Sequence, residues 1–132
     1  MYRSLVWRGI ILFLVIFWFG IFNLVYAHQM SPTYPEWSSS YLDGLSVTRV
    51  RVFNKRKDVE YYEIGVFDKD MKPIPFVTQY DIRGIKYHNY AEFTIYLNDK
   101  YKDDAVYVCS KSMLKEIEST GLVSKICSKF KE

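Results

Sequence analysis

The stretch TRVRVFNKRKDVEYYEIGVFDKDMKPIPF, residues 48–76, decides the fold because apolar and polar side chains alternate along two runs of it. This period of two is typical of half-buried strands. The positions expected to face inward are Val50, Val52, Tyr62, Ile64 and Val66. The polar segment 54–58, Asn-Lys-Arg-Lys-Asp, is expected to be a solvated turn that closes the two strands into a hairpin.

The rest of the chain continues as short segments separated by turn signals. We expect a weak strand at 82–87, a strong one at 91–97, another at 105–110, a helical turn at 112–119 and a final strand at 122–130. Short strands at intervals of about ten residues are typical of an immunoglobulin-like sandwich. The predicted fold is therefore all-β, an immunoglobulin-like antiparallel sandwich over residues 45–132 with one short helical turn, preceded by an apolar N-terminal leader helix.

The amino terminus has the composition of a secretory leader. Arg3 and Arg8 precede an apolar run at 10–22, and a segment with small residues ends at Ala27. That order predicts a signal peptide, residues 1–27, cleaved after Ala27. The alternative is an uncleaved membrane anchor, because Ile10 to Ala27 is 18 residues, just enough to cross a hydrocarbon core of roughly 30 Å. Either way the domain is expected to be exported, so that it is periplasmic, secreted or held at the membrane outside the cytoplasm.

Residues 28–44, between the leader and the sandwich, are rich in Pro, Ser and aromatic side chains and have no sustained period. We expect an extended arm, since Pro32 and Pro35 exclude a central strand. The aromatic residues Tyr34, Trp37 and Tyr41 are candidates for contact with a partner, and the alternative is that they pack on the domain.

Charge and chemistry exclude several functions. With Arg3 and Arg8 in the leader, 16 basic residues remain against 15 acidic ones, which gives no electrostatic case for binding nucleic acid. No Gly-rich phosphate loop, G-x-S-x-G or H-E-x-x-H motif occurs, and the paired acids 68/70 and 103/104 lie in predicted turns. The sequence therefore favours a protein that is not an enzyme.

The chain has two cysteines, Cys109 and Cys127. In an exported protein an even number of cysteines predicts a disulfide, here a structural one. The alternatives are two buried thiols or a redox pair, but the spacing is not C-x-x-C.

The two histidines raise the alternative of a copper protein. Cleavage after Ala27 would leave His28 as the first residue, and its amine and imidazole could chelate copper together with His88. This arrangement resembles the histidine brace of copper-dependent polysaccharide oxygenases and periplasmic copper carriers. The competing interpretation of His88 is a surface loop residue.

The run V-R-V-F-N at 50–54, the strand 61–68 and Pro73-Ile-Pro-Phe76 resemble the amino-terminal domain of fimbrial periplasmic chaperones. Those immunoglobulin-like domains cap pilin subunits by lending a strand to an unfinished sheet, and the resemblance covers roughly residues 45–110. The resemblance does not extend to the second chaperone domain, and it does not place the paired basic residues that grip the pilin carboxylate. The short exported format also resembles small secreted proteins encoded by bacteriophages.

The function expected from these features is an exported, non-enzymatic adaptor or chaperone-like domain that binds a protein or a component of the cell envelope. Strand addition at a sheet edge is the expected mode. The two alternatives are the copper protein and a membrane-tethered structural subunit of a virion or envelope complex.

Overall fold

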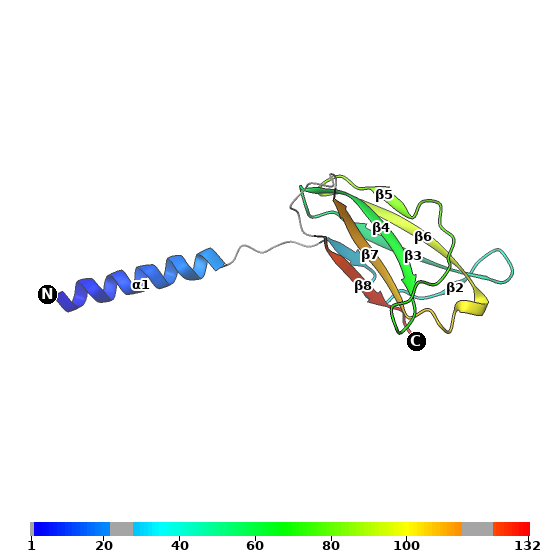
Figure 1. Cartoon of the computed structure of the whole chain (residues 1–132), viewed down its shortest axis with the longest axis horizontal. Helices are drawn as coiled ribbons and strands as arrows, with labels where there is room; N and C mark the ends of the chain where they lie inside the picture. Colours follow the sequence, from blue (N-terminus) through cyan, green and yellow to red (C-terminus); the bar gives the residue numbers. More distant parts are fainter. Residues whose placement is uncertain (1, 22–27, 115–122) are drawn as a thin grey trace.

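The computed structural model describes residues 2–21, 28–114 and 123–132 (Figure 1). A helix, α1, spans Tyr2–Ile21. The strands are β1 (Gln29–Ser31), β2 (Ser38–Ser39), β3 (Leu45–Phe53), β4 (Val59–Phe67), β5 (Ile82–Gly84), β6 (Tyr90–Asn98), β7 (Tyr107–Leu114) and β8 (Lys125–Lys129). One turn of 3-10 helix, Asp99–Tyr101, follows β6.

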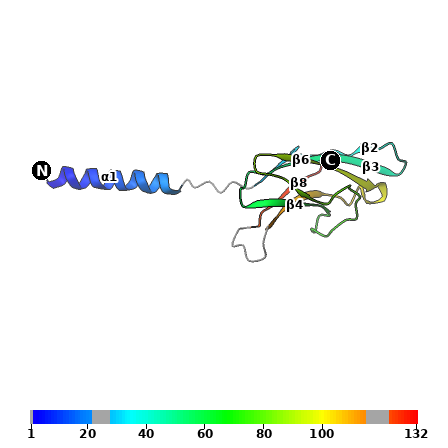
Figure 2. The same cartoon turned by 90° about the horizontal axis from the view of Figure 1, so that it is seen from above.

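The strands form two antiparallel sheets stacked as a sandwich (Figure 2). In the first sheet β6 pairs with one side of β3, and the short strands β1 and β2 pair with the other. The second sheet has the order β5-β4-β7-β8. The predicted all-β immunoglobulin-like sandwich is thus confirmed.

The core lies between the two sheets and is built from every second residue of the long strands. Its buried members include Val50, Val52, Tyr62, Ile64, Val66, Phe93, Ile95, Leu97 and Val108. All five positions predicted to face inward from residues 48–76 are among them. The alternation of β3, β4 and β6 therefore follows from the sequence, as predicted.

The predicted hairpin over residues 48–76 is wrong. β3 lies in the first sheet and β4 in the second, so segment 54–58 crosses between the sheets. Its first residue, Asn54, is fully buried rather than solvated. The Asn54 amide nitrogen donates to the carbonyl oxygens of Val59 and Ile85 at 2.7 and 2.8 Å, and these bonds offset the cost of burying the side chain.

The predicted helical turn at 112–119 is also wrong where the structure describes it, because residues 112–114 belong to β7. Ser112 lies opposite Tyr62 of β4, and its N–H donates to the Ser124 carbonyl oxygen at 2.8 Å. These long-range bonds outweigh the local helical preference. Residues 115–122, which hold the rest of this prediction and the start of the predicted final strand, lie outside the described residues.

The proline-rich segment 28–44 supplies the outer edge of the first sheet. β1 pairs with Arg51–Phe53 and β2 with Ser46–Val47, and the chain leaves the sheet between them.

The secretory role of residues 1–27 stays a prediction. Over the described residues, no helix has the length and apolar character required to cross a bilayer.

Candidate functional site

The outer edge of β8 is the candidate binding site, and the hydrogen bonds around it define which backbone groups are free. Phe130 N–H donates to Val106 O at 2.9 Å, and Ser112 N–H donates to Ser124 O at 2.8 Å. Because residues of an antiparallel strand alternate in bonding direction, the even-numbered residues of β8 bond to β7. The backbone N–H and C=O groups of Lys125, Cys127 and Lys129 consequently point away from β7.

Within the described chain no strand covers this edge, so Lys125–Lys129 is an open stretch beyond β7 (Figure 1). The stretch ends where Lys131 N–H donates to Pro35 O at 2.9 Å. The 4.0 Å between the Cα atoms of Cys109 and Cys127 is the close spacing of a non-hydrogen-bonded pair, which agrees with this assignment.

The outer edge of β6, by contrast, is covered along much of its length. Val77 and Tyr96 exchange two backbone hydrogen bonds of 2.8 Å. Thr78 Oγ1 donates to the carbonyl oxygen of Thr94 at 2.9 Å. Arg83 donates in the same way to Glu92 O at 2.8 Å. Since β1 and β2 cover β3, β8 offers the longer run of unpaired backbone among the described strands.

The disulfide predicted from the cysteine count is present between Cys109 and Cys127. The two residues lie directly opposite each other, so the bond fastens the edge strand β8 to β7. Cys109 is buried and Cys127 is exposed. The bond therefore holds β8 in place without occupying its outer backbone groups.

The outer face of the second sheet carries a shallow hollow beside the disulfide. It measures about 210 Å³, and its lining includes Glu63, Gly65, Phe67, Cys109, Lys111 and Lys125. Gly65 leaves room for the Phe67 ring, because a Cβ at this glycine would lie 2.9 Å from that ring. The Lys125 ammonium sits 4.4 Å from the centre of the same ring, a cation–π contact.

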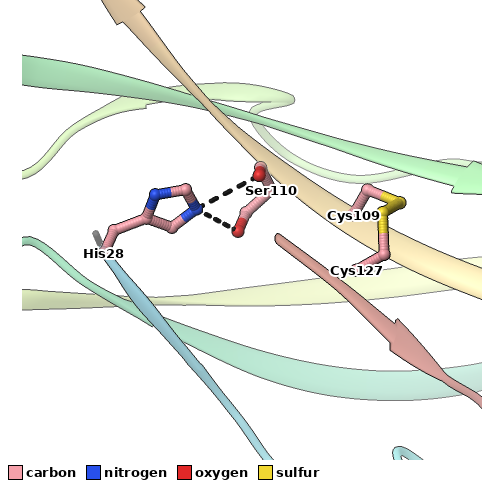
Figure 3. The surroundings of a disulfide bond; sticks show 4 residues. All are labelled: His28, Cys109, Ser110 and Cys127. Atoms are coloured by element: carbon pink, nitrogen blue, oxygen red, sulfur yellow. Dashed lines mark hydrogen bonds between the residues drawn. A yellow bond between two sulfur atoms is a disulfide. The ribbon is translucent and has the colours of Figure 1, made fainter. Parts of the chain in front are cut away.

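His28, a predicted copper ligand, is buried on the inner side of β7, and Figure 3 shows its ring directed at Ser110. Nε2 lies 3.1 Å from the Ser110 carbonyl oxygen and 2.7 Å from Ser110 Oγ. A carbonyl only accepts, so Nε2 carries the proton and Nδ1 accepts from the Ser124 hydroxyl at 2.8 Å. Burial lowers the pKa of His28 below its usual value.

The polar contacts of the interior extend from His28 toward the crossing segment. The Tyr62 ring lies 4.8 Å from the His28 ring, and the Tyr62 hydroxyl donates to Asn54 Oδ1 at 2.7 Å. Burial raises the pKa of Tyr62 to about 12, so the hydroxyl stays a donor at physiological pH. This chain of contacts connects the residue before β1, strand β4 and the β3–β4 crossing.

The second predicted copper ligand, His88, lies in the turn before β6, where its ring stacks on Tyr87 at 3.8 Å between centroids. Its side chain is exposed, whereas both ring nitrogens of His28 are hydrogen-bonded to serines. A copper ion at His28 would have to replace one of these bonds. Across the described ranges no group of three or more His, Cys, Asp or Glu residues gathers, and the copper site stays a prediction.

The three aromatic residues predicted to contact a partner lie in different environments. Trp37 packs against the core and stacks on Phe130 at 4.6 Å between ring centroids. Its buried Nε1 has no hydrogen-bond partner among the residues that the structure describes. Tyr34 and Tyr41 are 64% and 85% exposed and remain available for contact.

Sequence reasoning proposed an open edge but did not identify β8 as that edge. The alternation of Lys125, Cys127 and Lys129 was visible in the sequence, and lysine is common on edge strands. The buried role of Asn54 and of Ser110 had no such signal. Short polar residues are common in turns and on surfaces as well as in buried networks.

No protein-family model matches the sequence, and no curated protein does either. Among solved structures, the periplasmic chaperone SfaE matches with a TM-score of 0.51 at 13% identity, over 79% of this chain and 56% of that one. The PapD-like domain 7 of human CEP192 has a TM-score of 0.45 at 7% identity, over 80% and 85% of the two chains. A FixG-related protein from Vibrio parahaemolyticus has a TM-score of 0.47 at 15% identity, over 80% and 96%.

The chain thus spans little more than half the length of SfaE. At this level of identity the match shows a shared fold. The predicted resemblance to the chaperone domain is confirmed at that level, and the chain has the fold of a chaperone-type immunoglobulin-like domain.

Proposed function

We propose that the protein is an exported, chaperone-like binding domain that pairs with an extended segment of a partner protein along β8. The observation that carries this proposal is the outward direction of the backbone groups of Lys125, Cys127 and Lys129. Each of the three residues offers one donor and one acceptor to an added strand. A backbone hydrogen bond contributes about 0.5–1.5 kcal/mol net, so a short strand binds measurably only if the site is already ordered.

The disulfide supports both the mode of binding and the export. Because Cys109 and Cys127 join β7 to β8, the edge is held in strand geometry before a partner arrives. Disulfides persist in oxidising compartments such as the periplasm, which fits a leader that directs the chain out of the cytoplasm. The fold shared with the periplasmic chaperone SfaE is consistent with a protein partner.

Two matched variants at one position test strand addition. Lys129→Ala and Lys129→Pro both remove the same charge, but only proline removes the outward N–H. Because this N–H does not bond to β7, both variants should keep the fold, as proline is tolerated at the free side of an edge strand. The measurement is capture of partner proteins from an envelope extract by each variant, with equal thermal unfolding as the check on folding.

We expect Lys129→Ala to retain most of the captured protein and Lys129→Pro to lose it. Equal capture by the two variants would show that the backbone of β8 does not bind the partner, and the proposal would then be wrong.

A further inference from the structure

We infer that the segment paired with β8 is acidic. One carboxylate lies opposite Lys125 and another opposite Lys129, each two residues away from a central residue that lies opposite Cys127. This inference rests on the proposed strand addition and specifies the class of partner. Its basis is the arrangement of positive charge along the open edge.

Two lysines face each other next to this edge. Lys111 of β7 and Lys125 of β8 are cross-strand partners on the outer face. They form a non-hydrogen-bonded pair, the class in which side chains approach most closely. Like charges at directly opposite positions are destabilising, and a carboxylate on an added strand would offset this repulsion. The Lys125 ammonium, which lies over the Phe67 ring, has no carboxylate partner among the ion pairs of the described residues.

Little negative charge of the domain itself compensates these lysines. Neither Lys111 nor Lys125 forms an ion pair within the described residues, although Glu63 of β4 lies opposite Lys111. Lys129 Nζ lies 3.7 Å from a carboxylate oxygen of Glu132, whose side chain is 91% exposed and easily displaced. The edge therefore presents positive charge to an incoming strand.

The same charges disfavour a second copy of this chain as the partner. Antiparallel self-pairing centred on Cys127 would place Lys125 of each copy opposite Lys129 of the other. Both pairs would be like-charged, a device that edge strands use against self-association. A strand with carboxylates at the first and fifth of five positions makes both pairs favourable instead.

The test uses three synthetic nine-residue peptides that differ only at positions 1, 5 and 9. The first repeats Glu-Val-Thr-Val and so has Glu at these positions. The second has Lys and the third has Ser in place of each Glu. Each is titrated into the isotopically labelled full protein, and the backbone amide NMR shifts are followed. The amides of Lys125, Cys127 and Lys129 report on the edge. Lys125→Glu/Lys129→Glu is the test variant, and Lys86→Glu/Lys100→Glu, which flanks β6 in the other sheet, is the control with the same net charge.

We expect the acidic peptide to shift the three outward amides of β8 and to bind at least about fivefold more tightly than the serine peptide at low salt. The test variant should prefer the lysine peptide, while the control should keep the preference for the acidic one. Equal binding of all three peptides at β8 would overturn the acidic partner and leave strand addition standing. Shifts that avoid β8 with every peptide would overturn both.

Discussion

Removing the Asn54 side chain tests whether the buried polar contacts hold the two sheets together. The Asn54 amide nitrogen donates to Val59 O at 2.7 Å and to Ile85 O at 2.8 Å. Its Oδ1 accepts from the Tyr62 hydroxyl at 2.7 Å and from Arg56 N–H at 2.8 Å. Four groups from the crossing segment, from β4 and from the segment after β5 thus depend on one side chain.

In Asn54→Ala these four groups lose their partner at a position that is fully buried. The backbone N–H of Arg56 is only partly buried and can turn to water. The Tyr62 hydroxyl and the two carbonyl oxygens cannot, and a buried group left without a partner costs about 1–3 kcal/mol. Near the lower end of that range, the loss sums to roughly 3–5 kcal/mol, a large part of a typical total of about 5–15 kcal/mol.

Tyr62→Phe is the matched control because it removes a single bond from the same network. Asn54 Oδ1 still accepts from Arg56 N–H, so no buried acceptor is left empty. We expect this variant to cost about 1 kcal/mol. The measurement is the free energy of unfolding in urea, followed by near-ultraviolet circular dichroism with the disulfide intact. If Asn54→Ala costs no more than Tyr62→Phe, the crossing segment is not held by the Asn54 side chain and this reasoning fails.

Three further changes address the other features. Since burial lowers the pKa of His28, the unfolded chain binds a proton that the folded chain does not, and the free energy of unfolding should fall as the pH drops below about 6.5. His28→Gln should flatten this pH dependence in urea unfolding. Equal slopes of the free energy of unfolding against pH for the wild type and the variant would contradict the prediction. Replacing Cys109 and Cys127 by serine removes a link between residues that are 18 positions apart, and it should lower the free energy of unfolding by about 3 kcal/mol. Thermal or urea unfolding measures this loss. An unchanged free energy of unfolding would mean that β8 stays in place without the disulfide. Mass spectrometry of the exported protein should find a chain that begins at His28, and an intact Met1 would favour the membrane anchor instead.

The sequence predicted the long strands well because alternation is a local signal. Val50 and Val52 face the core for the same reason that Ile64 and Val66 do, and each pair is visible within a few residues. The sheet to which each strand belongs is not a local property. A charged connection of five residues between two strands suits a hairpin as well as a crossing, and only the contacts of Asn54 distinguish them.

The candidate site was beyond sequence reasoning for a related reason. An edge is defined by the order of strands, and β8 becomes an edge because β7 is its sole partner in the described structure. The misassigned residue Ser112 shows the same limit, since its strand conformation depends on Tyr62 and Ser124, which are distant in sequence. Composition identified the disulfide because pairing of two cysteines in an exported chain needs no knowledge of topology.

An open edge that is preformed by a disulfide should self-associate unless something prevents it, and the lysines of β8 are the residues in a position to do so. Lys129→Glu tests this directly, because it makes the edge self-complementary: in an antiparallel pair centred on Cys127, each new carboxylate faces Lys125 of the other copy. Two unfavourable pairs become favourable ones, worth about 1–3 kcal/mol together, or roughly a 5- to 150-fold gain in dimerisation. Sedimentation equilibrium should show dimers for this variant at concentrations where the wild type and Lys125→Glu/Lys129→Glu stay monomeric. The same association state for all three proteins would mean that charge does not control pairing at β8.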